Sequence, residues 1–502
     1  MSTISLRDVG VLSPHPLFQN LTLAIGDADR IGLIAGNGGG KTTLLKCLTG
    51  LIEPTTGDIV RSRGMRVGYV EQDVPANLLN LPLAEAIRRA LPAAERDSEA
   101  WRVDVVLDEF GATPDLHDRP LHALSGGWQR LALIARTWVT EPDALLLDEA
   151  TNHLDLAKIQ MLEGWLATCR VPMVIASHDR RFLDACTNRT LFLRPGVSRL
   201  YSHPYTRARE LLAADDAAQE AKLAKETREV DRLRRNANEL KNVGINSGSD
   251  LLLKKSKQLR ERAAALELTF ASAHTERSGD IRLANRGTHA KLLLGLHGVD
   301  VCAPDGRMLF RIGKLDVFQQ DRIAVLGRNG VGKSQLVRLL RQAMSGGDVP
   351  GVRASPSIVL GYVDQLMSHL PDAMTPHDFI SGTFRPGDQR SVSLLAGAGF
   401  NVDMQRRAIA RLSPGQKARL GLLALRLTEP NFYLMDEPTN HVDIAGQERL
   451  EAEILAHEAT CVIVSHDRAF VRAIATRFLL VDDGKIAEID APEPFYRTLT
   501  AG

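Results

Sequence analysis

Five sequence motifs occur twice in this chain, in the same order in each half. RIGLIAGNGGGKTTLL at residues 30–45 returns as RIAVLGRNGVGKSQLV at 322–337, and GYVEQ returns as GYVDQ. LSGGWQRLAL, ALLLDEATNHLD and VIASHDRRF return as LSPGQKARLGL, FYLMDEPTNHVD and VIVSHDRAF. Partner residues lie 288 positions apart at the serine, aspartate and histidine motifs, and 292 apart at the two loop lysines. This near-constant spacing indicates a duplicated domain.

The order of patterns within each copy predicts its fold. Each copy reads as a strand, a glycine-rich loop, a helix, a polar helical middle and then short aliphatic strands. DALLLDE and VPMVIASH are continuously apolar, as expected for strands buried on both faces of a sheet. We therefore expect an α/β chain with two P-loop domains, each with a largely parallel sheet and a helical insert before the serine motif.

A helical hairpin is predicted between the copies. Apolar residues fall at heptad spacing on both sides of a polar break at residues 242–250, which indicates two antiparallel helices turning at 244–248. Residues 232–262 hold nine Lys and Arg against three Asp and Glu, so we expect a contact with phosphate, with a plain solvated coiled coil as the alternative. The predicted domains are 1–205, 206–275 and 276–502. The seam residues are Leu223, Val230, Leu233, Ala237, Leu240, Leu252, Leu259, Ala263, Leu266 and Phe270.

Bulk properties exclude several classes of protein. The five cysteines are scattered and contain no CxxC pair, which argues against a disulfide framework or a zinc site and fits a reducing compartment. No secretory signal and no apolar run of about 20 residues is evident, so we expect a cytoplasmic protein without a spanning segment. The net charge of +1 gives no general preference for nucleic acid.

The glycine-rich loops predict phosphate binding. A loop that leaves a strand and opens a helix points several N–H groups at one place, where the helix dipole adds positive potential. Lys41 and Lys333 are placed to reach the β- and γ-phosphates of ATP, and Thr42 and Ser334 to hold Mg²⁺. Ala35 replaces the glycine found at 327, which is tolerated if its φ stays negative. The predicted loop residues are Gly36, Asn37, Gly38, Gly39, Gly40, Lys41, Thr42, Thr43, Gly327, Arg328, Asn329, Gly330, Val331, Gly332, Lys333 and Ser334.

Carboxylates, histidines and glutamines complete each predicted site. Asp148 and Asp436 end aliphatic strands and are predicted Mg²⁺ ligands, and the glutamate after each is placed to polarise the attacking water. Each histidine lies 29 residues beyond its glutamate; the repeated spacing favours a γ-phosphate contact over a core histidine. The glutamines are expected to sense Mg²⁺ and the water. The predicted catalytic residues are Glu149, Glu437, His178, His466, Gln72 and Gln365.

Two further positions have open interpretations. Phe18 and Phe310 each precede the loop lysine by 23 residues, where an aromatic ring could stack on the nucleotide base. A role as core residues covering the sheet is slightly favoured. A serine followed by two glycines at a helix start predicts an N-cap with exposed N–H donors, and hence a second phosphate site.

The LSGGW, DEATNH, DEPTNH and SHDR runs resemble those of ATP-binding cassette proteins, over both copies and most of the chain. The resemblance implies ATP hydrolysis at two composite sites, with the serine motif of one cassette facing the phosphate loop of the other. Ser413 and Gly415 would complete the first site, and Ser125, Gly126 and Gly127 the second. Pro414 removes one N–H donor from the first site, so we expect the two sites to be unequal.

Tandem cassettes joined by a helical linker look like the F subfamily, whose members act on ribosomes. The resemblance implies that the linker reaches large-subunit RNA and tRNA, and that one chain acts as a monomer because its own cassettes pair. The short hairpin tip favours a translation factor over an antibiotic-resistance protein. The alternatives of another class are the ATPase subunit of a membrane transporter, which would require a separate membrane partner, and a DNA-maintenance ATPase.

Overall fold

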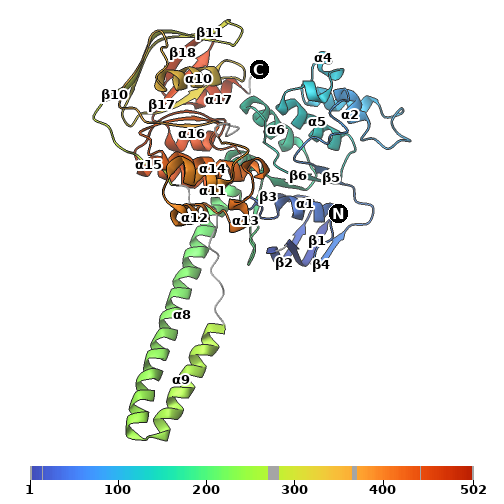
Figure 1. Ribbon diagram of the computed structural model, residues 1–502. Coiled ribbons are helices and arrows are strands. Elements are labelled where there is room, and N and C mark those ends of the chain that lie inside the picture. The colour runs from blue at the N-terminus through green and yellow to red at the C-terminus, as the bar shows by residue number, and fades with distance from the viewer. Residues whose placement is uncertain (1–2, 14, 269–281, 365–369, 441, 500–502) are drawn as a thin grey trace.

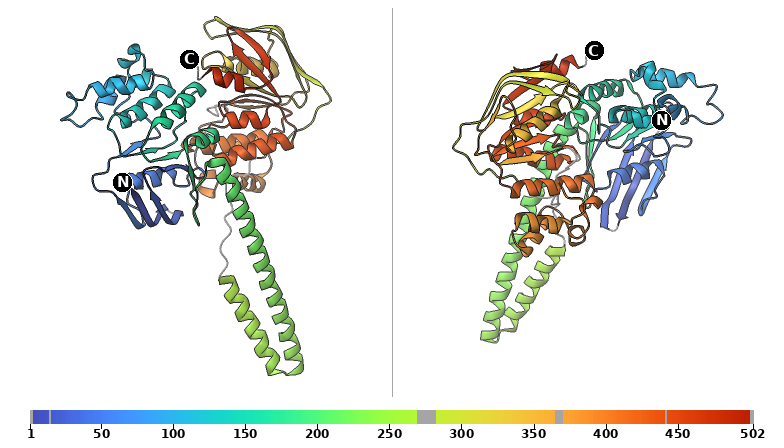
Figure 2. Two further views of the ribbon diagram at one scale, coloured as in Figure 1. Left: turned by 180° about the vertical axis from the view of Figure 1, so that it is seen from behind. Right: turned by 45° about the horizontal axis from the view of Figure 1, so that its top comes forward.

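The computed structural model describes residues 3–13, 15–268, 282–364, 370–440 and 442–499 (Figure 1). Two α/β cassettes lie side by side, and a long helical hairpin projects away from both of them (Figures 1 and 2). The predicted fold class, two cassettes with a helical linker, is confirmed. None of the helices within the described ranges is long and apolar enough to cross a membrane.

The N-terminal cassette has two sheets. An antiparallel sheet has the order β2-β1-β4, and a six-stranded sheet has the order β5-β6-β7-β3-β8-β9, parallel except for its last strand. Every residue of β6 and β7 is buried, as the continuous apolar runs predicted. The strands are β1 Ile4–Ser13, β2 His15–Ile25, β3 Arg30–Ile34, β4 Thr56–Arg61, β5 Val67–Val70, β6 Ala144–Leu147, β7 Met173–Ala176, β8 Arg189–Phe192 and β9 Arg199–Tyr201.

The C-terminal cassette repeats this plan in one sheet of nine strands. Its order is β13-β10-β11-β18-β17-β12-β16-β15-β14, and the last six strands correspond one by one to the six-stranded sheet of the first cassette. Phe18 and Phe310 are fully buried in equivalent core clusters. The strands are β10 Leu292–Cys302, β11 Met308–Phe318, β12 Arg322–Leu326, β13 Val352–Ala354, β14 Leu360–Val363, β15 Phe432–Asp436, β16 Thr460–Val464, β17 Arg477–Asp482 and β18 Lys485–Ile489.

The helices also correspond between the cassettes. The first cassette has α1 Lys41–Thr49, α2 Leu83–Arg88, α3 Trp101–Glu109, α4 Pro114–His117, α5 Gly126–Trp138, α6 Leu156–Thr168 and α7 Arg180–Cys186. The second has α10 Lys333–Met344, α11 Pro376–Phe384, α12 Asp388–Gly397, α13 Val402–Gln405, α14 Pro414–Leu427, α15 Ile444–Ala456, α16 Arg468–Ile474 and α17 Glu493–Thr498. Short 3-10 turns, Leu121–Ala123 and Ile409–Arg411, precede the serine motifs.

Side-chain caps fix where most of the helices near the interface begin. Ser125 and Ser413 cap α5 and α14, which confirms the N-caps expected from the sequence. Pro414 occupies the first turn of α14, where its missing N–H breaks no helical hydrogen bond. Aspartates cap α6, α7, α15 and α16 in the same way.

The linker is an antiparallel hairpin of α8 Tyr205–Ser247 and α9 Asp250–Leu268. Val230, Leu233, Ala237 and Ala263 are buried along its seam, and Ser256 donates a 2.7 Å hydrogen bond across it to the Ala237 carbonyl. Phe270 lies outside the described residues. The turn is shorter than predicted, because α8 continues through the polar break and ends only at Gly248, whose φ of 66° stops a helix.

The seam generates a stability prediction. Leu233→Ala removes buried aliphatic atoms from a contact between only two helices, so the hairpin should lose about 2 kcal/mol of local stability. Amide hydrogen exchange should quicken in α8 and α9 while the cassettes keep their protection. Leu251→Ala, at an exposed tip position, is the matched control. Equal exchange rates in the two variants would contradict the packing of this seam.

Candidate active site

The phosphate loops follow the parallel strands β3 and β12 and open the helices α1 and α10. Both helices start at a left-handed glycine, Gly40 or Gly332, and neither has a side-chain cap. A Cβ on Gly332 would lie 2.7 Å from Leu309, so its glycine is needed for close packing as well as for its φ of 108°. Ala35 is not among the residues with positive φ, which is the condition under which alanine can replace glycine at this position of the loop. Uncapped N–H groups beside a buried lysine fit a bound phosphate.

In the first cassette three predicted residues meet directly. Lys41 Nζ lies 2.9 Å from Glu149 Oε1 and 2.9 Å from His178 Nε2, and this histidine nitrogen is 3.1 Å from the same carboxylate oxygen. Burial opposes ionisation of Glu149, but the charges and hydrogen bonds of His178 and Lys41 outweigh it and hold the pKa of Glu149 well below its usual range. The first glutamate is therefore ionised near neutral pH.

The second cassette arranges the same residue types differently. Lys333 Nζ donates to the carbonyls of Gly327, at 2.8 Å, and Arg328, at 3.0 Å, both in its own loop. Glu437 accepts a 3.1 Å hydrogen bond from the His466 backbone N–H, and its other oxygen lies 3.5 Å from His466 Nε2. Burial raises the pKa of Glu437 to about 8 and lowers that of His466 to about 4. At neutral pH this carboxyl is largely protonated.

The two glutamates share an unusual backbone conformation. Glu149 has a φ of 54° and Glu437 a φ of 52°, in the left-handed region that non-glycine residues rarely occupy. Such a conformation costs on the order of 1–3 kcal/mol, and residues held in it gather at functional sites. The same conformation recurs at equivalent positions of both cassettes, beside the loop lysine in the first cassette and the histidine in the second.

The predicted Mg²⁺ ligands lie beside the loop hydroxyls. Burial raises the pKa of Asp148, opposed by a hydrogen bond from Thr42, and burial likewise raises that of Asp436, opposed by Ser334. Each carboxyl–hydroxyl pair offers the oxygen ligands that Mg²⁺ prefers. The side chain of Gln72 is exposed, and Gln365 lies outside the described residues.

Arg130 is a buried residue of this site that the sequence analysis missed. Its guanidinium donates to the backbone carbonyls of Glu71 and Gln72 and to that of Asp148. It thereby ties the glutamine loop and the end of strand β6 to helix α5. Ala418 lies 288 positions further on, so comparison of the two copies conceals this arginine rather than revealing it.

Each phosphate loop is contacted by the opposite cassette. Asp443, which caps α15 through one oxygen, accepts a 2.9 Å hydrogen bond from the Asn37 backbone N–H through the other. Asp155 caps α6 in the same way, and its second oxygen lies 3.5 Å from Asn329 Nδ2. The sequence analysis assigned neither aspartate a role, although their recurrence at the end of both repeated TNH motifs was a usable signal.

A cavity of about 440 Å³ lies at the second site, between the cassettes. One wall holds Lys333, Ser334, Asp436, Glu437 and His466, and the other comes from residues 151–154 with His178 and Asp179. Within the described part of the chain, the residues that line this cavity do not include the predicted serine motif, Ser125, Gly126 and Gly127. His153 lines the cavity and lies against Gly126 and Gly127, so the residue 151–154 segment stands between the serine motif and the cavity.

Comparison with known proteins gives the family. The ABC transporter family model matches residues 18–152 and 311–440, more than half of the chain. ABC transporter F family member 5 of Arabidopsis thaliana is 29% identical over 96% of this chain and 75% of its own length. The probable ATP-binding protein YbiT of Escherichia coli O157:H7 is 30% identical over 94% of both chains. A solved chain described as ribosome-bound archaeal Pelota and ABCE1 shares the fold, with a TM-score of 0.62 and 17% identity over 99% of this chain and 80% of that one.

The chain belongs to the ATP-binding cassette family, in its F subfamily of tandem-cassette proteins. It is accordingly an ATP hydrolase. The family model matches both copies of the duplicated fold.

The role of Arg130 is testable. Arg130→Met keeps the volume but leaves the carbonyls of Glu71, Gln72 and Asp148 without this donor, and should displace Gln72 and Asp148. A displacement of this kind should lower turnover at the first site by about 10²-fold, measured in a Glu437→Gln background. Arg119→Met, an exposed arginine of the same helical lobe, is the control and should change nothing. A variant that keeps its turnover but needs a higher Mg²⁺ concentration would also support this role of Arg130. A variant whose turnover and Mg²⁺ dependence are both unchanged would contradict it.

The different glutamate environments generate a pH prediction. A general base works in its deprotonated form, so kcat/KM at the second site should rise about tenfold per pH unit between 6 and 8 and then level off. This profile should appear in Glu149→Gln, where only Glu437 remains. In Glu437→Gln the remaining base is Glu149, which is already ionised at pH 6. Titration of the base should therefore cause no rise of kcat/KM between pH 6 and 8. Superimposable profiles would show that the two environments are equivalent during turnover.

Proposed function

We propose that this chain hydrolyses two ATP molecules at composite sites between its cassettes. The contacts of Asp443 and Asp155 with the opposite phosphate loops carry this proposal, because they show each loop already facing the other cassette. Closure would then bring Ser413 and Gly415 to the first loop, and Ser125, Gly126 and Gly127 to the second. In that movement the residue 151–154 segment, which now covers Gly126 and Gly127, would have to shift.

The residues of each site would divide the chemistry as follows. The loop N–H groups and Lys41 or Lys333 would hold the phosphates, while the histidine of each site would contact the γ-phosphate. The ionised glutamate would take a proton from the attacking water. Thr42 with Asp148, and Ser334 with Asp436, would hold Mg²⁺, which neutralises charge on the phosphate oxygens when bound.

The two sites would work at different rates. The first site has an ionised glutamate in contact with Lys41, and a facing serine motif that Pro414 deprives of one N–H. The second has a largely protonated glutamate and a complete glycine motif. ATP must therefore draw Lys41 away from Glu149 in one site, and promote deprotonation of Glu437 in the other.

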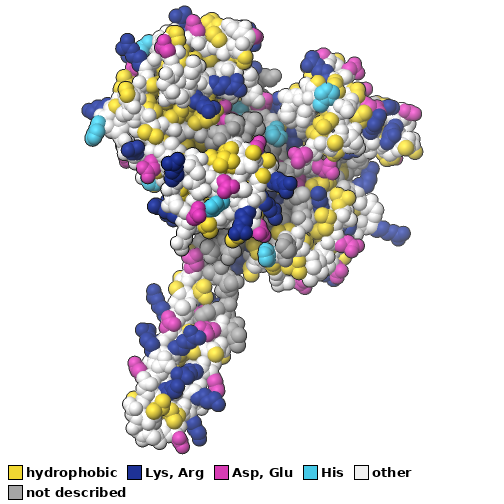
Figure 3. Space-filling model, in the orientation of Figure 1, with side chains coloured by type: hydrophobic (Ala, Val, Ile, Leu, Met, Phe, Trp, Pro, Cys, Tyr) yellow, Lys and Arg dark blue, Asp and Glu magenta, His cyan; other side chains and the backbone are white. Residues whose placement is uncertain are grey.

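The ribosome is the partner that the hairpin supports best. All nine Lys and Arg side chains between residues 232 and 262 are exposed. Figure 3 shows Lys and Arg side chains distributed along the visible face of the projecting hairpin. Val243, Ile245 and Leu251 expose aliphatic side chains at the tip. Short basic helices of this kind suit structured RNA, which is recognised by shape and phosphate. Cassette closure would fix the hairpin in large-subunit RNA near tRNA, and hydrolysis would release it; this is the action of a cytoplasmic, monomeric translation factor.

Ribosome co-sedimentation tests this function. The Glu149→Gln/Glu437→Gln double variant should bind ATP without hydrolysing it. It should sediment with ribosomes only when ATP is present. A charge-reduced hairpin, with Lys254, Lys255 and Lys257 changed to Gln, is the matched control and should sediment less. Its deficit relative to the full-charge hairpin should shrink as salt is raised, because fewer phosphate contacts give a weaker salt dependence. ATP-loaded double variant that stays in the supernatant would overturn the ribosome proposal and leave the ATPase assignment intact.

A further inference from the structure

The contact between the cassettes is built from residues that recur at the same spacing of 288. Apolar residues at the start of α6 and α15 pack across it: Leu156 lies in a buried cluster with Val471 and Phe495, and Ile444 lies in the core of the first cassette. The remaining members are charged: Arg180 and Arg468, Glu163 and Glu451, and Asp179 and Asp467. Because each half contributes the same patch, the contact has the reciprocal form of a twofold interface.

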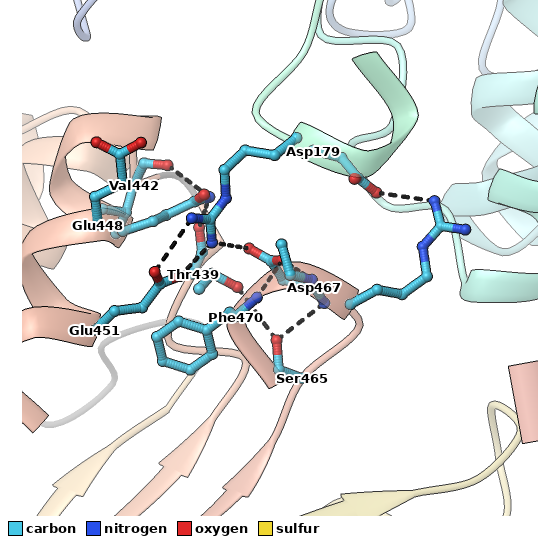
Figure 4. Close-up of polar contacts among 12 residues, drawn as sticks. Asp179, Thr439, Val442, Glu448, Glu451, Ser465, Asp467 and Phe470 are labelled. Atoms are coloured by element: carbon cyan, nitrogen blue, oxygen red, sulfur yellow. Dashed lines mark hydrogen bonds and ion pairs between the residues drawn. The ribbon is translucent and has the colours of Figure 1, made fainter. Parts of the chain in front are cut away.

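The charged residues make two matching ion pairs across the interface. Arg180, at the start of α7, donates from both terminal nitrogens to Glu451 on α15, with Nη1 3.2 Å from Oε2. Arg468, at the start of α16, donates in the same forked manner to Glu163 on α6, with Nη1 3.4 Å from Oε2. Each guanidinium also lies 3.9 Å from an aspartate of the opposite cassette, Asp467 or Asp179. Figure 4 shows Glu451, Asp467 and Asp179 gathered around this contact.

These ion pairs are shielded from solvent. The side chains of Arg180 and Glu451 are 13% and 12% exposed, and those of Arg468 and Glu163 are 9% and 18% exposed. Burial alone would lower the pKa of both arginines, but the hydrogen bonds to glutamate and the nearby aspartates outweigh it and raise them. Removing one partner of a buried pair leaves an uncompensated charge, which is far more costly than losing an exposed pair.

The arginines lie two residues beyond the histidines of the two sites. The aspartate between them caps the following helix: Asp179 Oδ1 accepts from the Phe182 N–H at 2.9 Å, and Asp467 Oδ1 accepts from the Phe470 N–H at 2.9 Å. The cap restricts the backbone conformation between the histidine and the arginine. The position of each histidine is therefore coupled to a helix of the opposite cassette.

We propose that Arg180 and Arg468 are positioning residues, whose reciprocal ion pairs form a pivot that holds the cassettes in one orientation without nucleotide and aligns each histidine loop. The alignment of the histidines rests on the proposed function, whereas the holding of the cassettes does not. During closure the phosphate loops and serine motifs at the edges of the interface would move about this pivot, which lies between the two sites.

Single-molecule energy transfer tests the pivot without nucleotide or ribosomes. Exposed Val60 and Met308, one on each cassette, are changed to Cys for dye attachment, and exposed Cys302 is changed to Ser; the other cysteines are buried. The parent protein should show one narrow distance distribution. Glu163→Gln/Glu451→Gln, which keeps side-chain volume, should show a broader distribution. Glu493→Gln, which removes an ion pair within the second cassette, is the matched control and should resemble the parent.

Turnover tests the positioning role. In Glu163→Gln/Glu451→Gln, kcat should fall about tenfold while KM for ATP changes little, because the loss falls on alignment of the transition state. An unchanged distance distribution in the Gln variant would overturn the pivot. A broadened distribution with unchanged kcat would retain the pivot and overturn the histidine alignment.

Discussion

Burial of the central parallel sheets on both faces is the constraint on which the rest of this structure depends. A strand surrounded by apolar side chains has room for charged groups only where it ends. In both cassettes the carboxyl ends of β3, β6 and β7, or of β12, β15 and β16, lie at one edge and carry the phosphate loop, the Asp–Glu pair and the histidine. The chemistry is concentrated at this edge because it is the place where the sheet admits water and charge.

Duplication turns that edge into an interface. The aspartates that cap α6 and α15 use one oxygen for their own helix and direct the other to the opposite loop, so the start of a helix in one cassette is coupled to a phosphate site in the other. Between the two sites, the arginine–glutamate pairs and the apolar residues Leu156 and Ile444 exclude solvent. A low local dielectric strengthens each ion pair and makes it costly to leave one partner unpaired. This favours a fixed pivot over a contact that slides continuously.

Identical motifs do not produce identical sites. His178 and Lys41 contact Glu149 in the first cassette and hold its pKa down against burial. In the second cassette Lys333 donates to the carbonyls of its own loop, and burial raises the pKa of Glu437. Arg130 fixes the glutamine loop of the first site, whereas the position 288 residues further on is Ala418. The two sites therefore differ in these contacts as well as at Pro414.

The repeat and its apolar runs were enough to predict the two α/β cassettes, and heptad spacing was enough to predict the hairpin, because both signals depend on local periodicity and on residues close in sequence. The hairpin turn was placed too early, since Gly244 is tolerated inside α8 and only Gly248 ends it. Ser125 and Ser413 were correctly predicted as helix caps for the same local reason. Tertiary structure alone decided which groups meet across the chain: the second contact of Asp443, the partners of Arg180, and the ionisation of Glu437. Those depend on burial and on neighbours hundreds of residues away, which sequence spacing does not encode.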